Sequence, residues 1–131
     1  MQKHILVVED DERIVKALSV RLNAKGYHVL TAYDAIMAIQ KAMEQPPDLI
    51  LLDITMPGGN GLTVAERIKS STKTAHIPII FLTASKEPHL HKQALDLGAT
   101  AFFEKPFDFE ELLATVRAAL EHPNVNLSVT G

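Results

Sequence analysis

A short apolar run in the middle of the chain limits the fold more than any other feature. Leu49–Leu52 are four consecutive aliphatic residues, with prolines shortly before them and Asp53 and a glycine-rich segment after them. Such a run is too short to cross a membrane and suits a strand buried on both faces of a parallel sheet. Asp53 then stands at the carboxyl end of that strand, where open parallel sheets bind ligands. Taken alone, an aspartate at such a place is more often a turn or helix cap.

Strand and helix patterns alternate along the rest of the chain. Further strands are expected at Ile5–Val8, Tyr27–Ala32, Ile77–Leu82 and Thr100–Glu104. Five helices are also expected, and in chain order their buried faces are Ile14, Leu18 and Leu22; Ile36, Ile39 and Met43; Leu62, Ala65 and Ile68; Leu90, Ala94 and Leu97; and Leu112, Val116, Ala119 and Leu120. Asp34 and Asp108 are expected as N-caps, and Gly26 and Gly98 as helix ends. This alternation predicts a doubly wound α/β domain, a five-stranded parallel sheet of order 2-1-3-4-5 with five helices.

Composition narrows the class of protein. The chain has 131 residues, 47% of them hydrophobic, enough for one domain. The net charge of −3, without clustered Lys and Arg, argues against direct nucleic-acid binding by this segment. No cysteine is present, and the N-terminal apolar run meets acids after four residues, unlike a signal peptide or membrane segment. We therefore expect a soluble cytoplasmic protein that does not bind membranes.

Acidic residues follow two strands that the predicted order places side by side. Glu9 and Asp10 end the first strand and Asp53 ends the third, so their carboxylates should meet at the switch point of the sheet. Three carboxylates without a cation repel one another, so their assembly predicts a divalent metal. Mg²⁺, or Mn²⁺ in its place, suits these acids together with the backbone carbonyl of Thr55.

Two more polar side chains end the next two strands on the same rim. Thr83 offers a hydroxyl and Lys105 an ammonium, and both could reach anionic oxygens above Asp53. Together with the metal they describe a phosphoryl-transfer site in which Asp53 is the nucleophile and forms an acyl phosphate. Each residue alone is better explained as a cap, a strand-end hydroxyl or surface charge. Their coincidence on one rim favours the functional interpretation.

Four motifs carry a resemblance to a known family. ILVVEDD, LILLDITMPGGNG, IIFLTAS and AFFEKPF occur in order between Lys3 and Glu121. In these motifs the chain resembles the receiver domains of bacterial two-component response regulators, which have a flavodoxin-like fold. The resemblance implies that Asp53 accepts a phosphoryl group from a sensor histidine kinase or a histidine phosphotransfer protein. It also implies Mg²⁺ among Glu9, Asp10, Asp53 and the Thr55 carbonyl, with Thr83 and Lys105 contacting the phosphoryl group, and a cis Lys105–Pro106 bond.

The resemblance also implies a conformational switch. Phe102 matches the family's switch aromatic, which moves inward as the hydroxyl of Thr83 turns toward the phosphoryl group, whereas Phe103 should face the other side of the sheet. The face formed by the fourth helix, fifth strand and fifth helix would then control an unknown downstream effector. Residues 1–122 would form the receiver domain, and 123–131 a polar tail or linker.

Some features leave alternatives open. Thr100 and Ala101 replace an acidic pair that one DNA-binding branch of the family uses in dimers, which puts that dimer in doubt. His89 and His91 are expected on an exposed helix. A magnesium-dependent phosphatase with an aspartyl nucleophile, and an inactive receiver that only binds partners, are the competing functions. Hydrolysis of excess phosphate ester would distinguish the phosphatase from a receiver. The intact set of site residues argues against the inactive receiver.

Overall fold

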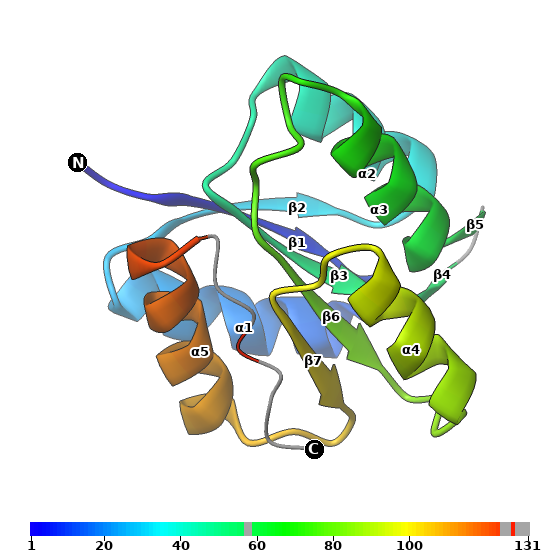
Figure 1. Cartoon of the computed structure of the whole chain (residues 1–131). Coiled ribbons are helices and arrows are strands. Elements are labelled where there is room, and N and C mark those ends of the chain that lie inside the picture. The colour runs from blue at the N-terminus through cyan, green and yellow to red at the C-terminus, as the bar shows by residue number, and fades with distance from the viewer. Residues whose placement is uncertain (57–58, 124–126, 128–131) are drawn as a thin grey trace.

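The computed structural model describes residues 1–56, 59–123 and 127, and its centre is one parallel sheet (Figure 1). The sheet has five strands in the order β2-β1-β3-β6-β7. Their bounds are β1 His4–Val8, β2 His28–Ala32, β3 Leu49–Asp53, β6 Ile79–Thr83 and β7 Ala101–Glu104. Counted along the chain, this is the predicted order 2-1-3-4-5, which is confirmed.

Helices cover both faces of the sheet (Figure 1). They are α1 Glu12–Ala24, α2 Ala35–Glu44, α3 Gly61–Ser70, α4 Pro88–Asp96 and α5 Phe109–Glu121. The predicted N-caps are present, since the side chain of Asp34 accepts from Met37 N–H and that of Asp108 from Glu110 N–H. Gly26 and Gly98, just beyond α1 and α4, have φ of 91° and 82°, a conformation that glycine adopts without strain.

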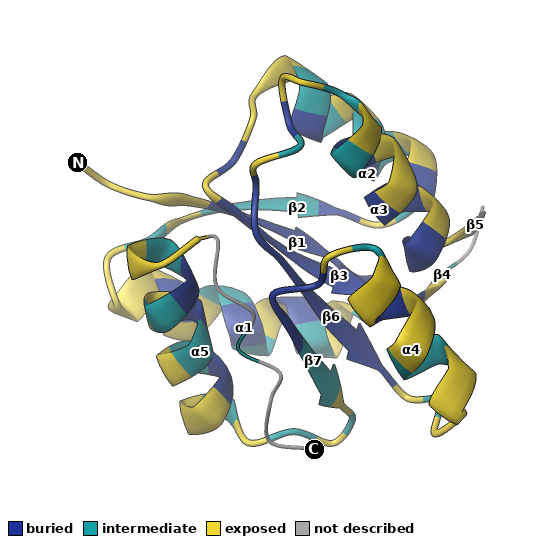
Figure 2. Cartoon of the chain, in the orientation of Figure 1, coloured by how far each residue is buried: buried dark blue, intermediate teal, exposed yellow. Residues whose placement is uncertain are grey.

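Two hydrophobic cores lie on opposite faces of the sheet, and Figure 2 shows the buried strands between them. One core contains side chains from α2, α3 and α4, and the other contains side chains from α1 and α5. Neighbouring residues of β7 divide between them, because successive side chains of a strand point to opposite faces. Phe102 packs on the first core and Phe103 on the second, as predicted.

The buried face of α2 differs from the prediction. The alanines at positions 35, 38 and 42 are buried, whereas Ile36 is 74% exposed and Ile39 and Met43 are half-buried. Both sets of residues have helical spacing, so periodicity could not distinguish them, and the larger apolar side chains were expected in the core. The small alanine side chains allow the helix to lie close to the sheet, and the expected position of Ile36 in the core is wrong.

A short antiparallel ladder follows β3 where only a loop was expected. It pairs β4 Thr55–Met56 with β5 Gly59–Asn60, and the side chain of Asn60 caps α3 by accepting from Thr63 N–H. Pro57 and Gly58 lie outside the described residues, as does most of the predicted 123–131 tail. In that tail, Leu127 N–H donates to the Thr100 carbonyl at 2.6 Å. Among the described residues no helix combines the length and apolarity needed to cross a membrane.

Candidate functional site

Three carboxylates meet where β1 and β3 end. One oxygen from each of Glu9, Asp10 and Asp53 lies within 4.8 Å of the others. Glu9 is fully buried and Asp53 is 2% exposed, whereas Asp10 faces solvent. The parallel pairing of β1 with β3, in which Val8 is opposite Leu52, brings these strand ends together. The predicted acidic cluster is therefore present at the switch point of the sheet.

Lys105 brings a positive charge to this cluster from the far edge of the sheet. Its Nζ donates to Glu9 Oε1 at 2.6 Å and to Asp53 Oδ2 at 3.4 Å. The Lys105 N–H bonds to the Thr83 carbonyl at 2.7 Å, which fixes the residue at the end of β7. The Lys105–Pro106 bond is cis, as the resemblance implied.

Backbone groups orient the two buried carboxylates. Thr55 N–H donates to Asp53 Oδ1 at 3.2 Å, and Asp11 N–H donates to Glu9 Oε2 at 3.1 Å. The chain also passes very close to Asp53 at Gly61, where an added Cβ would lie 2.3 Å from the Asp53 carbonyl oxygen. Only glycine fits there, so α3 begins directly against the strand that carries Asp53.

Burial dominates the electrostatics of the site. It raises the pKa of Glu9 from 4.5 to about 7, although the hydrogen bond from Lys105 opposes this. It likewise raises the pKa of Asp53, against the charge of Lys105. Burial alone would lower the pKa of Lys105, but its hydrogen bond to Glu9 and the charge of Asp53 raise it instead. One ammonium thus does not fully compensate the buried carboxylates, and a second cation would favour their ionised forms.

The donor set fits magnesium. Hard divalent ions prefer oxygen ligands, and Mg²⁺ in particular binds one or two carboxylates and keeps several waters. Glu9, Asp10 and Asp53 supply carboxylate oxygens, and the exposure of Asp10 leaves one side open to solvent. The site therefore has the chemistry that a bound Mg²⁺ requires.

Thr83 lies at the end of β6, next to the acidic cluster in the sheet. It is fully buried, and its Oγ1 accepts a hydrogen bond from Ser85 N–H at 3.0 Å. In the register of β6 with β7, Phe81 is opposite Phe102 and Thr83 opposite Glu104. Because side chains alternate along a strand, Thr83 shares a face with Phe81, the face on which Phe102 also packs.

Sequence reasoning missed three features of this region. Gly61 was seen as one of several chain breaks, although its place eight residues after Asp53 at a helix start was the available signal. Asp11 caps α1 by accepting from Arg13 N–H, a role that its position before the helical pattern could have shown. His91 was expected to be exposed with His89, but it is half-buried against Phe102.

The sequence and the site define a class of protein. The family model of the response regulator receiver domain matches residues 5–117, and the chain belongs to this family. The resemblance inferred from sequence is thereby confirmed, and the strand order of the sheet together with similar solved structures confirms the flavodoxin-like fold.

Individual relatives agree with this assignment. RpaA of Synechocystis, described as a DNA-binding dual master transcriptional regulator, is 41% identical over 116 residues, which cover 88% of this chain and 48% of RpaA. The chemotaxis response regulator CheY4 of Vibrio cholerae is 30% identical with a TM-score of 0.84, covering 90% of this chain and 98% of that one.

A third relative was solved with its metal. The receiver domain of the sensor histidine kinase PA1611 from Pseudomonas aeruginosa PAO1, with magnesium coordinated in the active-site cleft, is 28% identical with a TM-score of 0.84. The match covers 92% of this chain and 99% of that domain. By contrast, the chain spans about half the length of the curated relative RpaA.

Proposed function

We propose that this receiver domain is a phosphorylation-controlled switch whose phosphoacceptor is Asp53. The observation that carries the proposal is the position of the Asp53 carboxylate, which lies beside Glu9 and Asp10 and accepts a hydrogen bond from Lys105. The phosphoryl donor is a sensor histidine kinase or a histidine phosphotransfer protein, as in two-component signalling, and we place this exchange in the cytoplasm. Catalysis is limited to transfer onto, and loss from, the domain's own aspartate.

The residues of the site divide the work of transfer. A carboxylate oxygen of Asp53 forms a bond to phosphorus as the bond from phosphorus to the donor's histidine nitrogen breaks. Lys105 holds the acceptor in place and can neutralise charge on the transferring oxygens. Glu9, Asp10, Asp53 and the Thr55 carbonyl would hold Mg²⁺, which when bound offsets negative charge in the site. Mn²⁺ can replace it, since it accepts the same oxygen ligands.

The acceptor assignment is tested by substitution at Asp53. The protein is incubated with a small phosphodonor and Mg²⁺, and the adduct is mapped by mass spectrometry. Asp53→Asn should abolish the acid-labile adduct, whereas Asp96→Asn, an exposed aspartate of α4, should not change its rate of formation. Chelation of Mg²⁺ should stop both gain and loss of the group. Uptake by Asp53→Asn at the wild-type rate would disprove the assignment.

The competing enzymatic function makes a different prediction. A phosphatase with an aspartyl nucleophile would release phosphate from many equivalents of a phosphate ester, whereas a switch should take up about one phosphoryl group per chain. Measurement of phosphate release in excess ester separates the two. Sustained turnover that depends on Asp53 would favour the phosphatase.

We further propose that Thr83 and Phe102 carry the signal to the face formed by α4, β7 and α5. A phosphoryl oxygen above Asp53 offers the Thr83 hydroxyl a strong acceptor, which would draw it from Ser85 and leave room for the Phe102 ring. A charge-assisted hydrogen bond of about 1.5–3 kcal/mol shifts a two-state ratio roughly ten- to a hundredfold. The unphosphorylated protein should therefore already sample the active form. A downstream effector would read the altered face.

Amide NMR with and without beryllofluoride, a phosphoryl mimic, tests this route. Shift changes should extend from Asp53 into α4, β7 and the start of α5. They should shrink in Thr83→Ala but not in Thr72→Ala, which alters an exposed threonine. Changes that stay in the Asp53 pocket, or spread independently of Thr83, would contradict the route.

A further inference from the structure

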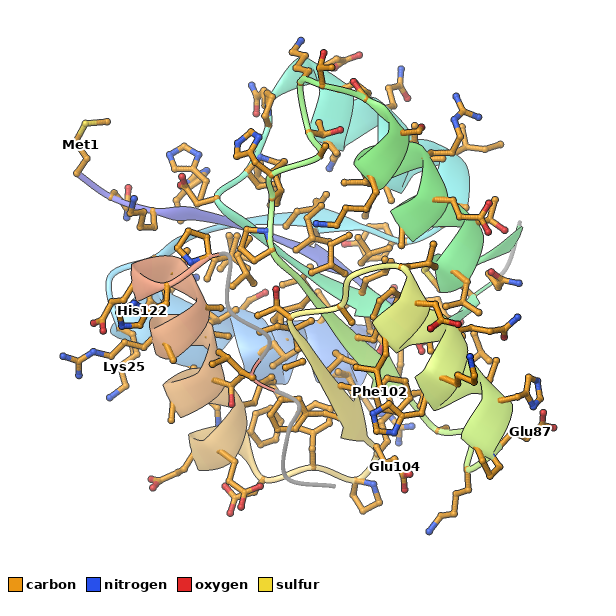
Figure 3. The ribbon with its side chains drawn as sticks, viewed as in Figure 1. Met1, Lys25, Glu87, Phe102, Glu104 and His122 are labelled. Carbon is orange, nitrogen blue, oxygen red and sulfur yellow. The ribbon has the colours of Figure 1, made fainter. Side chains whose placement is uncertain are left out.

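His91 of α4 packs directly against the proposed switch residue. Its ring lies parallel to that of Phe102, with centroids 4.4 Å apart and planes at 12°, and Figure 3 shows Phe102 between β7 and α4. Its neighbour His89, two residues earlier on the same helix, has a side chain that is 63% exposed and pairs with Glu87. The two histidines therefore differ, and only His91 has a contact with the moving part of the proposed switch.

The environment of His91 is unfavourable for a polar ring. Its Nε2 is buried and has no hydrogen-bond partner among the residues that the structure describes. A buried nitrogen without a partner opposes burial, because the same atom would be hydrogen-bonded in water. Stacking on Phe102 acts in the other direction, since parallel aromatic rings attract each other beyond the area that they bury. The position of His91 thus results from two opposed effects.

The contact lies on the side of the sheet where the proposed movement occurs. Phe102 packs on the same core as Phe81, its partner in the register of β6 with β7, and Thr83 shares that face. A shift of the Phe102 ring from α4 toward Thr83 would separate it from His91. The stack therefore belongs to the arrangement seen here and opposes that shift.

We infer that His91 is a positioning residue for the switch. Its ring holds Phe102 in the present arrangement, and its unpartnered Nε2 keeps that hold weak, so that engagement of Thr83 is sufficient to release it. This inference rests on the proposed function, because it concerns the movement of Phe102 that the proposal invokes. It adds the residue of α4 that sets how easily this movement occurs.

Two substitutions at His91 distinguish the effect of its ring, which holds Phe102, from the effect of its unpartnered nitrogen, which weakens that hold. His91→Ala removes the ring and the stack, which should favour release of Phe102. His91→Leu puts an apolar side chain of similar size in place of the polar ring, so it loses the stack but also the unpartnered nitrogen. Because a buried nitrogen without a partner costs more than a ring stack contributes, this variant should strengthen the hold. The measurement is the beryllofluoride concentration, with Mg²⁺ present, that half-saturates the amide shifts of Ala101–Glu104. It should fall about twofold to tenfold in His91→Ala and rise about twofold or more in His91→Leu.

The opposite directions are the critical result, since a purely structural role would disturb both variants alike. His89→Ala and His89→Leu are the matched controls and should leave half-saturation at the wild-type value. Urea unfolding of each variant verifies that it is folded. Unchanged half-saturation at position 91, or a shift of the same sign in both variants, would overturn the inference alone if wild type responds normally. A wild-type response confined to the Asp53 pocket would overturn the proposed function, and the inference with it.

Discussion

Replacement of Glu9 by glutamine should stabilise the metal-free protein, and should do so increasingly as the pH rises. Glu9 is fully buried, and its pKa in the folded protein is about 7, against an ordinary value of 4.5. The folded state therefore binds more protons than the unfolded state between these values, and stability is lost as the pH rises from about 4.5 through about 7. Glutamine has nearly the same shape as the protonated side chain but cannot ionise.

The size of the effect follows from that difference in pKa. At about 1.4 kcal/mol per pH unit, ionisation of Glu9 costs up to about 3 kcal/mol of unfolding free energy at pH 8, but less than about 1 kcal/mol at pH 5. Loss of the 2.6 Å contact with Lys105 offsets part of the gain, although Lys105 keeps Asp53 as a partner. We expect a net stabilisation by Glu9→Gln of about 1–2 kcal/mol at pH 8, and little change at pH 5.

The assay is urea unfolding in excess chelator at both pH values, repeated with Mg²⁺. Glu66→Gln, which neutralises an exposed glutamate of α3, is the matched control and should be nearly neutral under all conditions. Mg²⁺ should stabilise wild type more than Glu9→Gln, because a ligand of the folded state raises its stability and the variant has lost a carboxylate ligand. A variant that is less stable than wild type at pH 8, or a difference that does not depend on pH, would refute the reasoning.

Three further outcomes are expected. Gly61→Ala places a Cβ 2.3 Å from the Asp53 carbonyl oxygen, so it should lower the urea midpoint and weaken Mg²⁺ binding measured by titration. Lys105→Ala should keep a native amide NMR spectrum but lose most of its response to phosphodonor; a normal response would contradict its role. Ile36→Lys should change unfolding free energy by less than about 0.5 kcal/mol, whereas Ala38→Leu should destabilise by about 1–3 kcal/mol; the reverse would contradict the packing of α2.

The sequence was sufficient to predict the order of the sheet and the meeting of the candidate site residues for one physical reason. Parallel strands end at a common edge, so residues that directly follow apolar runs must meet there, however far apart they lie in the chain. Glu9, Asp53 and Lys105 were found in this way, and the structure brings all three together.

Features that depend on tertiary distances were not available from such patterns. In α2 the choice between Ile36 and its alanine neighbour depends on how closely the helix approaches the sheet. Likewise, the burial of His91 depends on the position of Phe102, which lies eleven residues further along the chain on β7, and helical periodicity does not contain this information. The β4–β5 ladder is too short to leave an alternating pattern.

The contact between Lys105 and Glu9 joins residues that are 96 positions apart. During synthesis, β1 and β3 can pair long before β7 exists, so an incomplete chain would present its aspartate without the lysine that belongs beside it. Non-local contacts of this kind form late, because the intervening chain must first be ordered. A nascent or truncated chain that lacks the last strand and helix should therefore be unable to perform the proposed phosphoryl transfer, and on that proposal, uptake of a phosphoryl group would report that the whole domain has folded.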